Sequence, residues 1–93
     1  MAPCGDRALL IAMPIRFYYR PQCGLCSELE PTLQRIAAQY HAAITRINID
    51  EDRVAWQRYW DRIPVIEIDG QPTLYEPIAP DMLRAAIRRA TKS

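Results

Sequence analysis

The sequence predicts a single α/β domain, and three observations carry that prediction. Apolar and polar residues alternate along residues 15–20 and again along residues 44–49, which is typical of β-strands. Between these segments the apolar residues follow one helical stripe. A strand, a helix and a strand form a βαβ unit, whose crossover should be right-handed. A length of 93 residues is enough for one small domain and too short for two.

The βαβ unit has a local signal in each of its parts. The first strand places three apolar residues on one face: Ile15, Phe17 and Tyr19. The helix that follows contains Pro31, which should kink it because the residue lacks a backbone N–H. Its inward stripe is Leu25, Leu29, Leu33, Ile36, Ala37 and Tyr40. The strand at residues 44–49 has one polar face, which suits the edge of a sheet.

Helical signals recur in two later segments. The acidic run at residues 50–52 suits the first turn of a helix that continues to about Tyr59. Helix capping accounts for these acids, and metal binding is the alternative. A last helix begins near Pro80. Its inward residues are Leu83, Ala86, Ile87 and Ala90.

A β-hairpin is predicted between these two helices. Residues 63–69 form its first strand, and Asp69-Gly70 is a tight turn. Residues 71–75 form the returning strand. Pro72 marks that strand as an edge because proline cannot donate to a neighbouring strand.

Composition excludes several classes of protein. Hydrophobic residues at 49% and charged residues at 25% indicate a folded globular chain. A net charge of +1 gives no surface for nucleic acid or an anionic membrane. The apolar run at residues 8–13 is far too short to cross a bilayer.

We therefore expect residues 1–14 to form a poorly ordered extension and residues 15–93 to form the domain. The count of three cysteines is odd, which favours a reducing compartment over a disulfide-stapled secreted fold. We expect a cytoplasmic monomer in which Cys4 has no function.

The Cys-x-x-Cys pair is the candidate site. At a strand-to-helix junction the first sulfur, that of Cys23, meets free backbone N–H groups and the positive end of the helix dipole, and both stabilise a thiolate. Cys23 is then the nucleophile, and Cys26, one turn later, is the resolving thiol. Arg20 adds a nearby cation. Half of a zinc site is the alternative, but Cys4 and His41 lie at no recognisable ligand spacing.

The order of elements, with this cysteine pair opening the first helix, resembles the minimal thioredoxin fold (β-α-β-α-β-β-α) and specifically small bacterial glutaredoxin-like proteins. The resemblance covers 15–90 and depends on the segment 20–26, on Pro31, and on Arg62-Ile63-Pro64-Val65. It implies a four-stranded mixed sheet with helices on both faces. It also implies that the bond before Pro64 is cis, which leaves the backbone of Ile63 free to pair with substrate. An ordinary trans proline is the alternative.

The same resemblance implies a set of substrate contacts around Cys23. These residues are Arg20, Gln22, Gly24, Leu25, Arg62, Ile63 and Pro64. Arg20 matches the basic residue that glutaredoxins have three positions before the cysteine. The Gly-Gly step with which glutaredoxins hold glutathione is replaced by the segment 76–81. There Pro80 removes an N–H and Glu76 could repel a carboxylate.

The resemblance and the cysteine pair together predict a glutaredoxin-like thiol-disulfide oxidoreductase. Its substrate would be a protein disulfide or a glutathione mixed disulfide, with glutathione as a co-substrate and no resident cofactor or metal. One alternative is a non-catalytic binding module that presents the Ile63-Pro64 edge to a partner. Another is a metal or iron–sulfur carrier that bridges two chains through Cys23.

Overall fold

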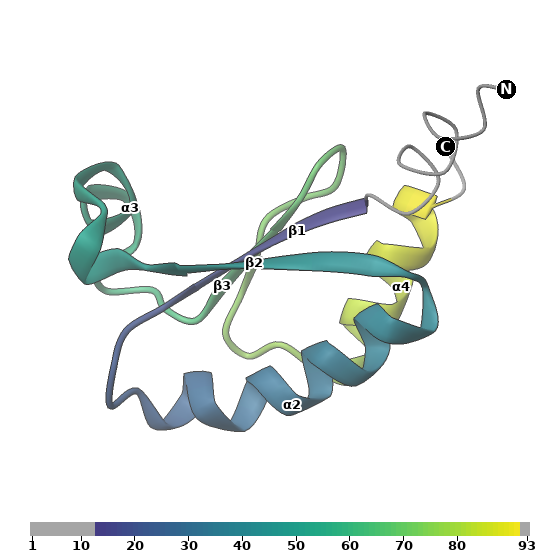
Figure 1. Ribbon diagram of the computed structural model, residues 1–93, viewed down its shortest axis with the longest axis horizontal. Coiled ribbons are helices and arrows are strands. Elements are labelled where there is room, and N and C mark those ends of the chain that lie inside the picture. The colour runs from purple at the N-terminus through teal and green to yellow at the C-terminus, as the bar shows by residue number, and fades with distance from the viewer. Residues whose placement is uncertain (1–12, 92–93) are drawn as a thin grey trace, which may run out of the picture.

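The computed structural model describes residues 13–91 and arranges them as a four-stranded sheet with helices on both faces (Figure 1). In chain order the elements are β1 (Met13–Tyr19), α2 (Gly24–Gln39), β2 (Ala42–Asn48), a 3₁₀ helix η1 (Ile49–Glu51), α3 (Arg53–Tyr59), β3 (Val65–Ile68), β4 (Leu74–Tyr75) and α4 (Pro80–Thr91). The predicted α/β class and minimal thioredoxin fold are confirmed.

The sheet is mixed, with strand order β2-β1-β3-β4. β1 pairs in parallel with β2 and antiparallel with β3, and β3 pairs antiparallel with β4. β2 is therefore an edge strand, as its polar face predicted. The centre of the sheet is β1, which leads directly to the cysteine pair.

The larger core lies between the sheet and the pair α2 and α4. Its fully buried side chains come from β1, α2, β3 and α4, and they include Ile15, Phe17, Leu33, Ile36, Ile66, Leu83 and Ile87. Each such side chain contributes roughly 1.5–3 kcal/mol by leaving water. This core fixes the position of α2, and hence of the cysteines, relative to β1.

A smaller core lies on the opposite face of the sheet, under α3. Its buried members are Tyr18, Ile49, Ala55, Tyr59 and Val65. Tyr18 follows Phe17 in β1 and therefore points to the other side of the sheet. The strand β1 is thus covered on both faces.

The helix predicted from residue 50 is divided into two short helices. The Asn48 side chain caps η1 by accepting from the N–H of Asp50 at 2.9 Å. The Asp52 side chain then caps α3 by accepting from the N–H of Ala55 at 3.0 Å. Two capping side chains four positions apart explain why the acidic run does not form one continuous helix.

Several strand boundaries differ from the prediction, including those of β2, which covers Ala42–Asn48 in place of residues 44–49. β1 begins at Met13, inside the segment expected to be an extension, because Met13 and Pro14 continue the pairing with β2. The rest of that segment, residues 1–12 with Cys4, lies outside the described residues. The hairpin strands are shorter than predicted, since β3 covers Val65–Ile68, β4 covers only Leu74–Tyr75, and residues 69–73 connect them.

The turn at Asp69-Gly70 does form within that connection. Gly70 has φ +83, where residues other than glycine are rare, and the N–H of Gln71 donates to the carbonyl of Ile68 at 2.9 Å. Pro72 follows at once and has no N–H for the ladder. This explains why β4 begins only at Leu74.

Helix α2 also differs from its prediction at one position. It continues through Pro31, and the kink predicted there stays a prediction. Leu25, predicted to face inward, is 52% exposed, and Cys26 occupies the buried position of the first turn. Successive helical residues are rotated by about 100°, so only one of these neighbours can face the sheet.

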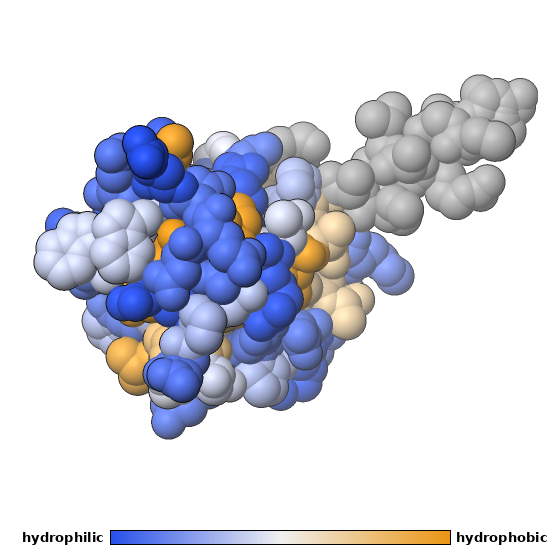
Figure 2. Space-filling model, turned by 60° about the vertical axis from the view of Figure 1, so that its left-hand side comes forward, coloured by the Kyte–Doolittle hydropathy of each residue, from blue (hydrophilic) through white to orange (hydrophobic). Residues whose placement is uncertain are grey.

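The surface seen in Figure 2 is mostly hydrophilic, with small and separate hydrophobic areas. The large apolar side chains that are exposed among the described residues are Leu25, Val54, Trp56, Trp60, Tyr75 and Met82. Scattered exposed apolar residues are normal for a folded domain. Leu25 differs from the rest because it lies between the two cysteines.

Candidate functional site

The cysteine pair lies where β1 gives way to α2. Cys23 is the N-cap of the helix and has extended backbone angles. Its Sγ accepts from the N–H of Cys26 at 3.1 Å, and its carbonyl accepts from the N–H of Ser27 at 3.0 Å. Cys23 and Cys26 form a disulfide, with a Cα–Cα distance of 5.2 Å. The predicted helix-terminal position of Cys23 is observed.

The two sulfurs differ in their access to solvent. Cys26 is 3% exposed and belongs to the larger core, whereas Cys23 is half-buried. Gln22 and Gly24, on either side of Cys23, are exposed, and a Cβ at Gly24 would meet no atom within 4 Å. A substrate can therefore approach Cys23 more readily than Cys26.

Arg20 contacts η1 and α3, the two helices that follow β2. Its Nε lies 3.0 Å from Oδ1 of Asp50 as an ion pair, without the alignment of a hydrogen bond. Its guanidinium also lies over the ring of Trp56, 5.0 Å from the centroid. The charge of Arg20 is thus shared with η1 and α3. A role of this residue toward Cys23 or a substrate carboxylate stays a prediction.

The segment 62–64 has the cis bond that the resemblance implied. The Ile63-Pro64 peptide bond is cis, and Pro64 is fully buried. Ile63 is half-buried and packs against both cores, and Cys23 packs against the larger one. The guanidinium of Arg62 lies over the ring of Tyr75 at 5.0 Å. The substrate contacts predicted for these three residues are not tested by the fold.

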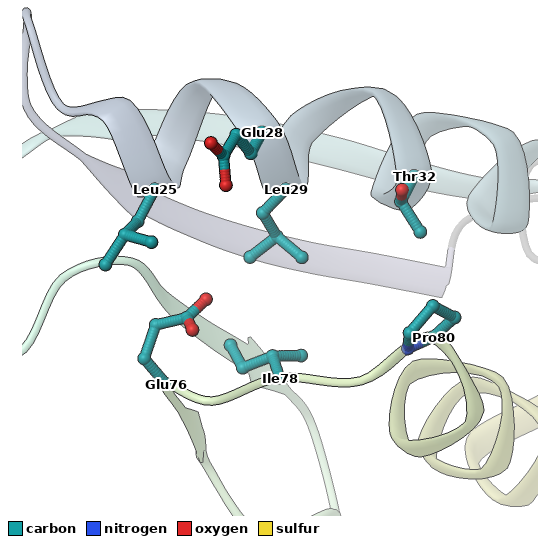
Figure 3. A pocket seen from close by; sticks show the side chains of 7 residues that line it. All are labelled: Leu25, Glu28, Leu29, Thr32, Glu76, Ile78 and Pro80. Atoms are coloured by element: carbon teal, nitrogen blue, oxygen red, sulfur yellow. The ribbon is translucent and has the colours of Figure 1, made fainter.

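A groove begins at the exposed side chain of Leu25 (Figure 3). It has a volume of about 200 Å³ and runs between α2 and the segment before α4. Its lining residues are Leu25, Glu28, Leu29, Thr32, Glu76, Ile78 and Pro80. The sequence analysis named Leu25 and Glu76 for separate reasons and did not place Glu28 in the same groove. The sequence hinted at this only through the helical spacing of Leu25, Glu28, Leu29 and Thr32, which puts them on one face of a helix.

A second feature that the sequence did not predict is a polar cluster around Glu67 on β3. Its carboxylate accepts from Nε of Arg16 at 2.8 Å, from the Tyr18 hydroxyl at 2.9 Å and from the Tyr59 hydroxyl. Burial and the hydrogen bond to Glu67 raise the pKa of Tyr59 to about 12. Burial by itself would raise the pKa of Glu67, but the donated hydrogen bonds outweigh it and the pKa is lowered. The cluster joins β1, β3 and α3.

Among residues 13–91, no group of three or more His, Cys, Asp or Glu side chains is placed to hold a metal ion. Over the same residues, no helix is long and apolar enough to span a membrane.

Several solved structures resemble this chain. The target protein XcR50 from X. campestris has 27% sequence identity and a TM-score of 0.67, over 81% of this chain and 96% of its own. A mutant thioredoxin from Halobacterium salinarum has 29% identity and a TM-score of 0.68, over 84% of this chain and 74% of its own. Thioredoxin 1 from Thermosipho africanus, at 19% identity, has a TM-score of 0.70 over 86% of this chain and 96% of its own, which shows the fold.

The fold and the cysteine pair together define the class: this is a thioredoxin-fold protein with a thiol-disulfide redox role. The family follows from the sequence itself. Residues 14–88 match the family model described as a glutaredoxin-like domain (DUF836). The chain therefore belongs to this glutaredoxin-like family. No curated protein matches the chain at a significant level.

Proposed function

We propose that this protein is a glutaredoxin-like thiol-disulfide oxidoreductase in which Cys23 is the nucleophile and Cys26 the resolving thiol. The observation that carries the proposal is the difference between the sulfurs of one disulfide. Cys23 caps α2 and is partly exposed, whereas Cys26 is buried behind it. A helix N-terminus favours a thiolate, and partial exposure lets that thiolate reach a substrate.

The reaction is two successive exchanges that start from the reduced protein. The Cys23 thiolate attacks a substrate disulfide, forms a mixed disulfide with one substrate sulfur and releases the other as a thiolate. Cys26 then loses its proton, and its thiolate attacks the Cys23 sulfur. This forms the Cys23–Cys26 disulfide and releases the remaining substrate thiolate. Two electrons pass to the substrate, and an external thiol must return them to the protein.

The substrate we propose is a protein disulfide or a glutathione mixed disulfide, with glutathione as a co-substrate. Substrate contacts would come from the exposed surroundings of Cys23 and from the segment 62–64. In the structure the backbone of Ile63 has no hydrogen-bond partner among residues 13–91, which supports strand-like pairing with a peptide. We propose no resident cofactor or metal, a monomeric state and a cytoplasmic location, where thiols are kept reduced.

A stoichiometric assay tests this proposal without knowledge of the electron donor. Reduced wild-type protein is mixed with an equal amount of a protein disulfide substrate, and released substrate thiols are counted. We expect reduction by the wild type and no reduction by Cys23→Ser. Cys26→Ser should attack once and stop at a mixed disulfide, which mass spectrometry detects as a covalent adduct.

The outcomes separate the proposal from its alternatives. If Cys23→Ser keeps the activity of the wild type, the redox proposal fails and a non-catalytic binding module is the better interpretation. Visible absorbance and metal content of freshly purified protein would instead reveal a metal or iron–sulfur carrier. Adducts trapped on Cys26→Ser in a cell extract would identify the physiological partners.

A further inference from the structure

The groove beside the disulfide combines an apolar floor with acidic walls. Leu25, Leu29 and Ile78 supply apolar surface. Glu28 on α2 and Glu76 on the segment before α4 line the space between these elements from opposite sides. In Figure 3 the Glu76 carboxylate points toward α2, and the Glu28 carboxylate lies over the α2 ribbon. Because Leu25 lies between the two cysteines, a substrate bound at Cys23 would lie at the mouth of this groove.

Neither carboxylate has an ion-pair partner within the part of the chain that the structure describes. No ion pair or hydrogen bond joins Glu28 or Glu76 to another residue among 13–91. Other acidic residues do have partners, since Glu30 pairs with Arg46, and Glu67 pairs with Arg16. No basic residue lines this groove. Over residues 13–91, two negative charges therefore line the groove that begins at Leu25, and neither has an ion-pair partner.

The two cations of the predicted site, Arg20 and Arg62, do not line the groove. Arg20 is paired with Asp50 and lies over Trp56. Arg62 lies over Tyr75 and lines a neighbouring pocket together with Glu76, but forms no ion pair with it and does not line the groove. The groove itself is acidic and apolar, whereas an anion-binding site needs donors or positive charge.

We propose that, of the two substrate classes named above, this groove favours protein disulfides that carry a Lys or Arg side chain beside the reacting sulfurs over the glutathione mixed disulfide. This inference rests on the proposed function. A long basic side chain suits the groove because its aliphatic stem can lie on Leu25 and Ile78 while its charged end meets Glu28 and Glu76.

The size and charge of glutathione fit the groove less well. Glutathione is anionic at neutral pH, and its carboxylates would face Glu28 and Glu76, where like charges repel. A volume of about 200 Å³ is also below the roughly 300–1,000 Å³ that is usual for sites enclosing a small molecule. It suits a single side chain of a larger substrate.

The bond changes remain those of the proposed reaction. Cys23 attacks the substrate disulfide, Cys26 resolves the mixed disulfide, and two electrons pass to the substrate. The groove affects only which substrate reaches Cys23. Glu28 and Glu76 are thus specificity-determining residues that take no part in the exchange itself.

The test uses three peptides that differ at a single position. Each has one cysteine in a mixed disulfide with neutral 2-mercaptoethanol, and the residue beside it is Lys, Gln or Glu. Single-turnover oxidation of the reduced wild type gives a second-order rate for each peptide. We expect the Lys peptide to react about tenfold faster than the Glu peptide, since two exposed ion pairs are each worth a few-fold. High salt should reduce this ratio.

Substitutions assign the effect to the groove. The double substitution Glu28→Gln with Glu76→Gln should bring the ratio close to one. Glu51→Gln, which removes one negative charge from η1, should leave the ratio unchanged. A general effect on the Cys23 thiolate would alter all three rates equally and leave the ratio intact. The glutathione mixed disulfide of 2-mercaptoethanol should behave as the Glu peptide does.

Two results would overturn the inference and one would overturn its basis. Equal wild-type rates for the three peptides would remove the groove's selectivity. If the doubly substituted protein kept the wild-type ratio of Lys-peptide to Glu-peptide rates, the selectivity would come from residues other than Glu28 and Glu76. If the reduced wild type reacted with none of the peptides or disulfides, the proposed function itself would fail.

Discussion

Cys23 and Cys26 are three residues apart and have different surroundings. Cys23 is the N-cap of α2 and its sulfur accepts the N–H of Cys26, whereas Cys26 is packed among core side chains. In the reduced protein that we propose, the helix terminus would favour a thiolate at Cys23, and burial would limit access to Cys26.

This difference predicts unequal reactivity after reduction. Iodoacetamide should alkylate Cys23 at least about tenfold faster than Cys26 at neutral pH, because the thiolate is the reacting species and Cys26 is buried. The measurement is the alkylation rate of the Cys26→Ser and Cys23→Ser proteins. Equal rates for the two proteins would contradict the assignment of Cys23 as nucleophile.

Arg20 supports a second prediction at the scale of residues. If its guanidinium meets a glutathione carboxylate, Arg20→Ala should slow reduction of a glutathione mixed disulfide a few-fold, since exposed ion pairs contribute about 0–1 kcal/mol. Reduction of a bulky protein disulfide should slow less.

A substitution of Asp50 serves as a control, because it should change the rate of the glutathione reaction in the opposite direction. Asp50→Asn removes the carboxylate that lies 3.0 Å from Arg20 Nε, so it should make the guanidinium more available and speed the glutathione reaction. Equal losses on both substrates in Arg20→Ala would mean that Arg20 acts only on the Cys23 thiolate.

At the scale of elements, Glu67 joins three of them. It lies on β3, accepts from Arg16 and Tyr18 on β1, and accepts from Tyr59 on α3. The short helix α3 is thereby tied to the sheet by a polar contact in addition to the smaller core. Removal of the charged acceptor would leave the two hydroxyl groups with weaker partners.

We predict that Glu67→Gln lowers the free energy of unfolding at neutral pH by about 1–3 kcal/mol, as expected for part-buried hydrogen bonds to a charged group. Urea unfolding of the two proteins measures the difference. Glu51→Gln, a change of the same kind on η1, should have little effect. A similar loss in both variants would show that the cluster does not stabilise the fold.

The stabilisation from Glu67 should also depend on pH in a defined direction. The folded pKa lies below the ordinary value of 4.5, so the folded state binds a proton less readily than the unfolded state does. The contribution is present above about pH 4.5 and is lost as the pH falls through the lowered folded pKa. The difference between the wild type and Glu67→Gln should therefore shrink in acid, and a constant difference would contradict this explanation.

Elements with a strong local pattern could be predicted from the sequence, and those that depend on distant partners could not. Alternation of Phe17 and Tyr18 predicted β1, and the spacing of Leu83 and Ile87 predicted α4. The start of β1 depends on its pairing with β2, which no local pattern records. The short β4 depends on the missing N–H of Pro72, which was recognised only as an edge signal.

For the site, the cysteine pair could be predicted because all of its features lie within a few residues. The groove could not, because Glu28 and Glu76 are far apart in the sequence and meet only after α2 and the segment before α4 are placed. The ion pair between Arg20 and Asp50 could not be predicted for the same reason. Arg20 is close to Cys23 in the sequence, which suggested a cation at the site, but the fold brings the Asp50 carboxylate of η1 to it.

At the scale of the whole molecule, the two cores share one sheet. Tyr18 and Val65 belong to the smaller core, while their neighbours Phe17 and Ile66 belong to the larger one. If either core came apart, one face of β1 and β3 would be exposed to water, and these strands also carry side chains of the other core. The described domain should therefore unfold as one cooperative unit.

A substitution in the larger core should accordingly be detected at the smaller one. Leu33→Ala, on α2, should cost about 2–5 kcal/mol, a large part of the roughly 4–12 kcal/mol expected for a domain of this size. Trp56 and Trp60 lie in α3 and at its C-terminal end, so their fluorescence reports on the opposite face of the sheet. In urea, the fluorescence transition and the far-UV circular dichroism transition should shift together.

Leu25→Ala removes the same side chain from an exposed position of the same helix and should shift neither transition by much. If Leu33→Ala moved the dichroism transition and left the tryptophan transition in place, the two cores would be separate units, and the cysteine pair would be held by the larger core alone.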